Sequence, residues 1–186
     1  MPTEFPDPYP PALDPYLNNS AVTSKIGSQH TWLSENTNVF DHFTSAGEIV
    51  RSSRSNLETV IDAGVRTVLY NGDADYICNY IGSEAMVRAS CFLLPFRAFS
   101  LTPSLYVQID SLNTTFSSLY AKQDFANYTV NGALAGLYKN AGTFSYLRIF
   151  GAGHQAAAYM WRGVPRGAAA LQMFTQVMSN QSLSST

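Results

Sequence analysis

The feature that most constrains this chain is the segment from Val65 to Gly82, in which a short strand pattern leads into a turn rich in carboxylates. Residues 65–70 are apolar and partly β-branched, which is typical of a buried strand. Asn71-Gly72-Asp73 then ends the strand, because these residue types tolerate tight turns. A second carboxylate, Asp75, follows at once. Since α/β folds keep their chemistry at the carboxyl ends of strands, this turn is a candidate site.

A second strand and turn of the same kind come later in the chain. The apolar residues 146–150 are followed by Gly151-Ala152-Gly153 and then by His154. Glycines allow the backbone to turn sharply and to present the imidazole at the sheet edge. Aspartate before histidine is the order of the last two members of the Ser…Asp…His triad in α/β-hydrolases. The sequence therefore predicts an α/β fold in which Asp75 and His154 form a catalytic pair.

The physical logic of this pair is that a carboxylate holds the Nδ1 proton of histidine, so that Nε2 can accept a proton from a nucleophile. Either residue alone has a simpler explanation, because carboxylates at strand-ending turns often cap a helix or bond their own backbone. Asp73 is a second candidate for the partner of His154. Its place between Gly72 and Ala74 favours a role in setting the turn, but the spacing does not decide between the two carboxylates.

Length and composition bound the class of protein. A chain of 186 residues with 46% hydrophobic content is long enough for one globular domain with a core. Charged residues make up 13% of the chain and the net charge is −2, so no basic patch favours nucleic acid or an anionic membrane surface. No apolar run approaches the length needed to span a membrane.

The cysteines and the remaining histidines give no sign of a metal site. Cys78 and Cys91 have no metal-ligand spacing with any histidine, and whether they pair or stay free is left open by the sequence. His30 and His42 lack carboxylate or cysteine partners at such spacing and are expected to be ordinary surface or packing residues. We therefore expect no metal and no cofactor.

Four N-x-S/T sequons favour a glycoprotein of the secretory pathway, at Asn18, Asn113, Asn127 and Asn180. The N-terminal residues 1–17 have neither the basic start nor the apolar core of a signal peptide. These two observations conflict, and we expect upstream sequence to be missing.

Apolar spacing and turn residues predict the other elements. Helices are expected over residues 13–26, 32–55, 56–63, 81–88, 110–124 and 168–178. A β-hairpin is expected from 128–130 and 135–138, because Asn131-Gly132 is a strong short turn signal. Residues 139–142 are expected to turn into a strand over 143–150.

Residues 88–108 form an atypical insertion, since they are apolar without a clear period and contain Pro95 and Pro103. Most of their residue types are encoded by pyrimidine-rich codons. The codons for Val87 and the residue after it can resemble a 5′ splice site, and those ending at Gln108 can resemble an acceptor splice site. A translated intron and a genuine surface insertion are both compatible with this pattern.

Two segments carry a family resemblance: NGDADYICNYIG, residues 71–82, and LRIFGAGH, residues 147–154. They resemble the C-terminal part of the serine carboxypeptidase family, as do residues 7–19 and 39–51. The resemblance implies an incomplete α/β-hydrolase sheet flanked by helices, with Asp75 and His154 as triad members and Cys78 as a free cysteine lining the substrate pocket. It also implies removal of C-terminal residues from peptides with a free C-terminus through an acyl-enzyme, in a secreted or vacuolar protein.

The chain also departs from the family pattern. It contains no G-x-S-x-G, which is the motif of the nucleophilic serine, and residues 155–167 are longer and altered after the histidine. We therefore expect residues 1–186 to be the C-terminal portion of one domain, to be inactive alone and to have the missing N-terminal half as partner. Two alternatives remain, namely a non-catalytic glycosylated binding module and a fragment of another α/β-hydrolase such as a lipase or esterase.

Overall fold

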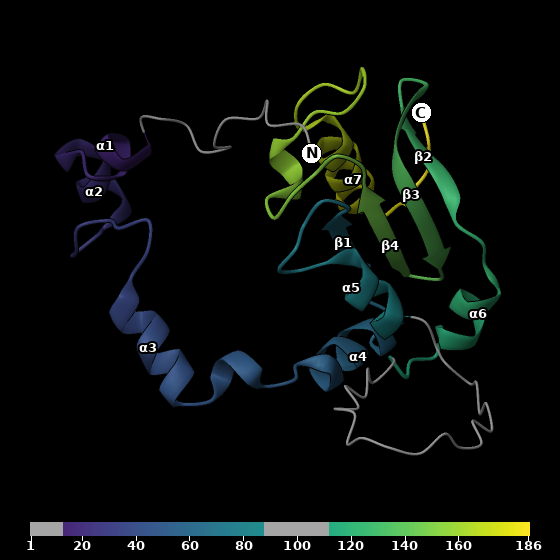
Figure 1. Cartoon of the computed structure of the whole chain (residues 1–186), viewed down its shortest axis with the longest axis horizontal. Helices are drawn as coiled ribbons and strands as arrows, with labels where there is room; N and C mark the ends of the chain where they lie inside the picture. The colour runs from purple at the N-terminus through teal and green to yellow at the C-terminus, as the bar shows by residue number, and fades with distance from the viewer. Residues whose placement is uncertain (1–12, 88–111) are drawn as a thin grey trace, which may run out of the picture. The chain divides into compact units, whose positions relative to one another are not determined.

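The computed structural model describes residues 13–87 and 112–186 (Figure 1). The backbone divides into two compact units, Met1–Ser53 and Arg54–Thr186. The atypical insertion at residues 88–108 lies outside the described residues, so its origin stays a hypothesis.

The described part of the first unit consists of short helices. These are α1 (Leu13–Leu17), α2 (Ser20–Ile26), α3 (Thr37–Ser45) and the 3₁₀ helix η1 (Glu48–Val50). The single helix expected over 13–26 is divided because Asn19 starts a new helix, its side chain accepting a hydrogen bond from the Ala21 amide. The single helix expected over 32–55 is also wrong, because Gly47 adopts a φ of 73° and interrupts it.

Helix α3 keeps the apolar spacing that the sequence showed, but its apolar face is exposed. None of residues 13–53 is buried, and Val39, Phe40 and Phe43 are each about half exposed or more. Among residues 13–53, therefore, nothing covers the apolar face of α3.

The second unit is built on a four-stranded sheet with the order β1-β4-β3-β2 (Figure 1). Its strands are β1 (Thr67–Gly72), β2 (Ala126–Val130), β3 (Ala133–Ala141) and β4 (Phe144–Ile149). Strand β1 is parallel to β4, whereas the β4–β3 and β3–β2 pairs are antiparallel.

The β2–β3 hairpin turns at the predicted dipeptide, where Asn131 and Gly132 both have positive φ, of 49° and 78°. This is the backbone that a two-residue type I′ turn requires. The turn expected at 139–142 is shorter than predicted, because β3 continues through Ala141 and the chain reverses at Gly142 and Thr143.

Helices flank the sheet: α4 (Arg54–Asp62), α5 (Tyr80–Val87), α6 (Ser117–Lys122) and α7 (Ala168–Met178). Helix α7 has the predicted bounds, whereas only residues 117–122 of the helix expected over 110–124 are helical. The residues before α6 are held in a loop by carboxylates of α4. The Thr115 amide and hydroxyl both donate to Asp62 Oδ1, and the Asn113 amide donates to Glu58 Oε1.

The core lies on both faces of the sheet, because side chains alternate along β4. Leu147 and Ile149 pack with Met173 of α7 on one face. Phe144 and Tyr146 pack on the other face, with residues of α4, α5 and α6. This mixed sheet with helices on both faces confirms the predicted partial α/β fold.

The residues after α7 return along the sheet and contact β2. The Thr186 amide donates to the Thr129 carbonyl, and the Thr129 amide donates to Ser185 Oγ. Leu183 is buried in the core on the α7 face. The polar residues at the C-terminus, 179–186, are therefore part of the fold.

In the described ranges, no helix combines the length and apolarity that crossing a membrane requires.

Truncating Leu147 to alanine is expected to lower the free energy of unfolding by about 3 kcal/mol, because the substitution leaves a cavity between β4 and α7. Leu147 has an exposed fraction of 0%, whereas Leu171 on the outer face of α7 is 65% exposed. The matched Leu171→Ala change should stay within about 0.5 kcal/mol. Urea unfolding of the two variants measures the difference, and equal losses would show that the core is not where we place it.

Candidate catalytic site

The site lies where the parallel strands β1 and β4 end side by side, since Gly72 pairs with Ile149 in the register. Backbone hydrogen bonds continue past the strands: the Asp73 amide donates to the Ile149 carbonyl at 3.0 Å, and the Ala74 amide donates to the Ala152 carbonyl at 2.9 Å. A Cβ on Gly72 would overlap the Ala152 carbonyl oxygen. Glycine at position 72 is therefore a requirement for the two turns to meet.

Asp73 ties the two turns together. Its Oδ1 accepts a hydrogen bond of 2.7 Å from the Gly151 amide. Burial raises the pKa of Asp73, and the Gly151 amide and the nearby Arg148 offset this only in part. Gly151 itself has a φ of 66° and packs so closely against Trp161 that a side chain would overlap the indole. Asp73 thus fixes the turn that carries His154 without contacting the imidazole.

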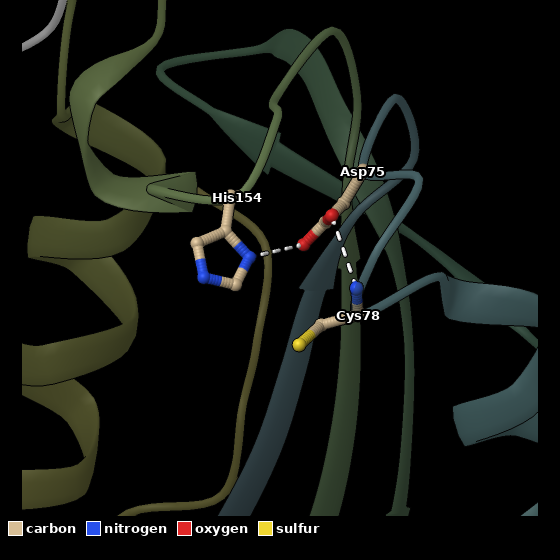
Figure 2. Close-up of side chains that lie close together, drawn as sticks. All are labelled: Asp75, Cys78 and His154. Carbon is tan, nitrogen blue, oxygen red and sulfur yellow. Dashed lines mark hydrogen bonds and ion pairs between the residues drawn. The ribbon is translucent and has the colours of Figure 1, made fainter. Parts of the chain in front are cut away.

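Asp75 makes that contact. Its Oδ2 lies 3.0 Å from Nδ1 of His154, although the two residues are separated by 79 positions (Figure 2). Its other oxygen, Oδ1, accepts hydrogen bonds from the amides of Ile77 at 3.0 Å and Cys78 at 3.1 Å. Hydrogen bonds within its own turn therefore orient the Asp75 carboxylate toward the imidazole on the turn that follows β4.

The two side chains differ in exposure, at 6% for Asp75 and 61% for His154. Burial acts to raise the pKa of Asp75, but the hydrogen bonds from His154 and from the Cys78 and Ile77 amides outweigh it, so the pKa lies below its ordinary value. Asp75 is then ionised near neutral pH and accepts the Nδ1 proton. Within residues 13–87 and 112–186, Nε2 of His154 has no hydrogen-bond partner. This leaves Nε2 able to accept a proton from an incoming group.

Cys78 is a free, exposed cysteine on the same turn as Asp75. Its carbonyl accepts a 2.9 Å hydrogen bond from Nδ2 of Asn71, which closes the loop between them. Cys91, its possible partner by sequence, lies outside the described residues. One ligand atom from each of Asp75, Cys78 and His154 falls within 4.8 Å of the others. From the spacing of residues along the chain we expected no metal site. That spacing could not indicate this group of three, because His154 is 79 positions from Asp75 in sequence and only the fold brings it close.

No hydrogen bond among the described residues joins the other predicted residues to this pair. His30 and His42 are exposed in the first unit, in line with their expected surface role. The four sequon asparagines, at positions 18, 113, 127 and 180, are all exposed. The Asn18 amide donates to the Trp32 carbonyl, and Asn180 Oδ1 accepts from Arg66.

Sequence reasoning missed an ion pair beneath the site. Arg148 of β4 lies 3.1 Å from Glu84 of α5, and both side chains are largely buried. The guanidinium also stacks over the Tyr80 ring, 4.6 Å from its centroid. A single arginine inside the apolar run 146–150 was the signal that could have revealed it. The ion pair holds the middle of α5 against β4, the strand that leads to His154, and the Tyr80 stacking holds the start of that helix.

Comparison with known proteins identifies the family. The sequence profile of the serine carboxypeptidase family matches residues 4–180. The chain belongs to the serine carboxypeptidase family. This confirms the resemblance found in the two turn segments, and it favours this family over the lipase or esterase alternative.

Individual relatives agree with this family. The chain is 33% identical over 181 residues to carboxypeptidase S1 of Penicillium janthinellum, covering 97% of this chain and 36% of the relative. It is 30% identical over 145 residues to carboxypeptidase Y of Komagataella phaffii, covering 77% of this chain and 24% of the relative. It is 28% identical over 183 residues to carboxypeptidase S1 homolog A of Arthroderma benhamiae, covering 95% and 24%. The chain thus spans between 24% and 36% of the length of these serine carboxypeptidases.

Replacing Gly72 by alanine is expected to push the two turns apart and lower the free energy of unfolding by about 1–3 kcal/mol, as overpacking does. It should also change the ring-nitrogen NMR shifts of His154, because the imidazole moves relative to Asp75. The matched control is Gly82→Ala in α5, where the nearest atom to an added Cβ is Asn79 Oδ1 at 3.5 Å. That variant should gain up to about 1 kcal/mol from helix propensity and leave the His154 shifts unchanged. Unchanged shifts in Gly72→Ala would contradict the close approach.

The two carboxylates are expected to have opposite effects on the pH dependence of stability. The pKa of Asp75 in the folded chain lies below its ordinary value of 3.8, so its contribution is present above that pH and lost as the pH falls through the folded pKa. The stability advantage of the parent over Asp75→Asn should therefore be constant near neutrality and shrink below pH 3.8. Urea unfolding of both proteins across this range measures it.

Asp73→Asn provides the comparison, because its amide oxygen can still accept from Gly151. The pKa of Asp73 in the folded chain lies above 3.8, so its contribution is greatest below that pH and lost as the pH rises through the raised pKa. The difference in the free energy of unfolding between parent and variant should therefore change with pH in opposite directions for the two carboxylates. A change in the same direction for both would contradict the environments assigned to them.

Proposed function

We propose that this chain supplies the histidine and the aspartate of a serine-type carboxypeptidase, which releases C-terminal residues from peptides. The observation that carries the proposal is the 3.0 Å contact between Asp75 Oδ2 and His154 Nδ1. It supports the role that the family resemblance implies for these two residues, because it is the orientation in which a carboxylate fixes the tautomer of a catalytic imidazole.

In the proposed reaction, Nε2 of His154 accepts the proton of a serine hydroxyl as the oxygen attacks the peptide carbonyl carbon. Asp75 stabilises the imidazolium that forms and stays ionised. The imidazolium then returns the proton to the leaving amine as the carbon–nitrogen bond breaks, leaving an acyl-enzyme. Water, activated by the same Nε2, hydrolyses the ester, and the proton returns to the serine.

The serine is proposed to come from further sequence of the same fold, since no G-x-S-x-G occurs in the 186 residues. Supporting this partner, the chain spans 36% of carboxypeptidase S1 and 24% of carboxypeptidase Y. In addition, β1 is the end strand of the described sheet and has β4 on one side only. Further strands beside β1 would complete the sheet, and we expect the chain alone to be inactive.

Cys78 is proposed to line the substrate pocket. Its exposed thiol lies beside the exposed imidazole (Figure 2). The altered segment 155–167 follows His154 directly in the chain and contains the 3₁₀ helix η2 (Ala156–Ala158) and a bridge between Trp161 and Val164. A peptide approaching His154 would thus meet both the thiol and this loop.

We further propose that the protein is a secreted or vacuolar glycoprotein. The exposure of all four sequon asparagines is compatible with glycosylation. Asn113 and Asn127 are the stronger acceptor candidates, because Asn18 and Asn180 make side-chain hydrogen bonds to Trp32 and Arg66.

The proposal is tested by a chimera in which this chain replaces the matching part of carboxypeptidase S1, so that the relative supplies the rest of the fold. The chimera is expected to release the C-terminal residue of an N-blocked dipeptide, and phenylmethylsulfonyl fluoride should inhibit it. Asp75→Asn and His154→Gln should each lower kcat by about ten-thousand-fold, because the imidazole loses its orientation or its base.

His42→Gln is the matched histidine control, since His42 is exposed in the first unit, and it should leave kcat unchanged. The chain alone should show no hydrolysis. A folded chimera that cleaves no dipeptide, or whose activity survives both substitutions at the pair, would overturn the catalytic assignment and favour a non-catalytic binding module.

A further inference from the structure

The Cys78 thiol takes no part in the proposed proton transfer, yet it lies against the Asp75–His154 pair. Ligand atoms from the three residues, one each, all lie within 4.8 Å of one another. In Figure 2 the sulfur is on the same side of the turn as the imidazole, below the hydrogen bond that joins His154 to Asp75. A thiol, an imidazole and a carboxylate therefore converge on one point at the surface.

Backbone geometry creates this convergence. Oδ1 of Asp75 binds the amides of Ile77 and Cys78, which turns the chain back so that the thiol returns toward the carboxylate. Asn71 holds the carbonyl of Cys78 from the strand side. The carboxylate and the thiol thus belong to one hydrogen-bonded turn. The close approach of Gly72 to Ala152 places the imidazole of His154 beside them.

These three groups match the ligand set of a thiophilic divalent ion. Zinc binds thiolate sulfur, imidazole nitrogen and carboxylate oxygen at about 2.0–2.3 Å, which places ligand atoms about 3.4–3.7 Å apart in a tetrahedron. Asp75 Oδ2 and His154 Nδ1 are already 3.0 Å apart, and Cys78 and His154 are exposed, so side-chain rotation can close the set. Thiolate in the set selects against magnesium and calcium, which prefer oxygen ligands.

We propose that Asp75, Cys78 and His154 form a zinc-binding site, with the fourth position open to water. On binding, the Cys78 thiol gives its proton to solvent and the sulfur forms a bond to the ion, while the Nδ1 proton of His154 moves by way of solvent to Nε2, so that Nδ1 can bind the ion. The two amide hydrogen bonds to Oδ1 of Asp75 orient the carboxylate from behind, as outer-shell partners do in metal sites. An ion held here occupies the imidazole, so zinc would block the proton transfer proposed above. That consequence depends on the proposed function, but the binding itself does not.

The test uses the full chain and cobalt(II) as a spectroscopic probe, followed by displacement with zinc. One equivalent of cobalt is expected to give the visible bands of a tetrahedral site and a near-ultraviolet thiolate-to-cobalt band, and zinc should abolish both. Calorimetric titration with zinc in buffers of different ionisation enthalpy should show proton release. Cys78→Ala and His154→Gln should each weaken zinc binding at least about tenfold, and Cys78→Ala should remove the thiolate band.

Cys91→Ser is the matched thiol control and His42→Gln the matched imidazole control, and both should keep the thiolate band and the affinity. Cys78→Ser, with a far-ultraviolet circular dichroism spectrum like the parent's, should lose the thiolate band as Cys78→Ala does. A band that survives at Cys78→Ala, or that disappears in Cys91→Ser, would overturn the site. Failure of this test leaves the catalytic proposal standing, because the chimera assay requires no metal.

Discussion

The parallel pairing of β1 with β4 is the constraint on which the rest of the site depends. Parallel neighbours end at the same edge of a sheet, so the two turns that follow them are forced together. Here the approach is so close that Gly72 has no room for a side chain beside the Ala152 carbonyl. Backbone hydrogen bonds and the Asp73–Gly151 contact then fix the two turns, and the Asp75–His154 distance follows from that frame.

Two carboxylates two positions apart serve different purposes because their surroundings differ. Asp73 points inward and bonds one amide of the opposite turn, and burial raises its pKa. Asp75 accepts two amides of its own turn and the imidazole, which together lower its pKa despite burial. The same residue type thus becomes a structural tie in one place and a charged partner for histidine in the other, as environment decides in other paired-carboxylate sites.

Apolar periodicity and turn residues correctly predicted the elements whose formation depends on neighbouring residues in the sequence. The strands before the two turns, the Asn131-Gly132 hairpin and helix α7 agree with apolar periodicity and turn chemistry. The errors have two origins. Asp62 and Glu58, distant in sequence, hold residues 113–115 in a loop where the apolar pattern predicted helix. Gly47 instead interrupts a periodic segment locally, through its own positive φ. The proximity of Cys78 to His154 escaped prediction because metal-ligand spacing rules assume ligands that are close in sequence.

The placement of residues 183–186 has a consequence for how the sheet associates. The tail uses both the amide and the carbonyl of Thr129, and it also engages the amides of Asn131 and Gly132. A second chain therefore finds these backbone donors of β2 and of its following turn already bonded, which disfavours edge-to-edge aggregation at this margin. At the opposite end of the described sheet, β1 pairs with β4 on one side only, so the two margins differ in how far their backbone groups are already bonded within the described residues.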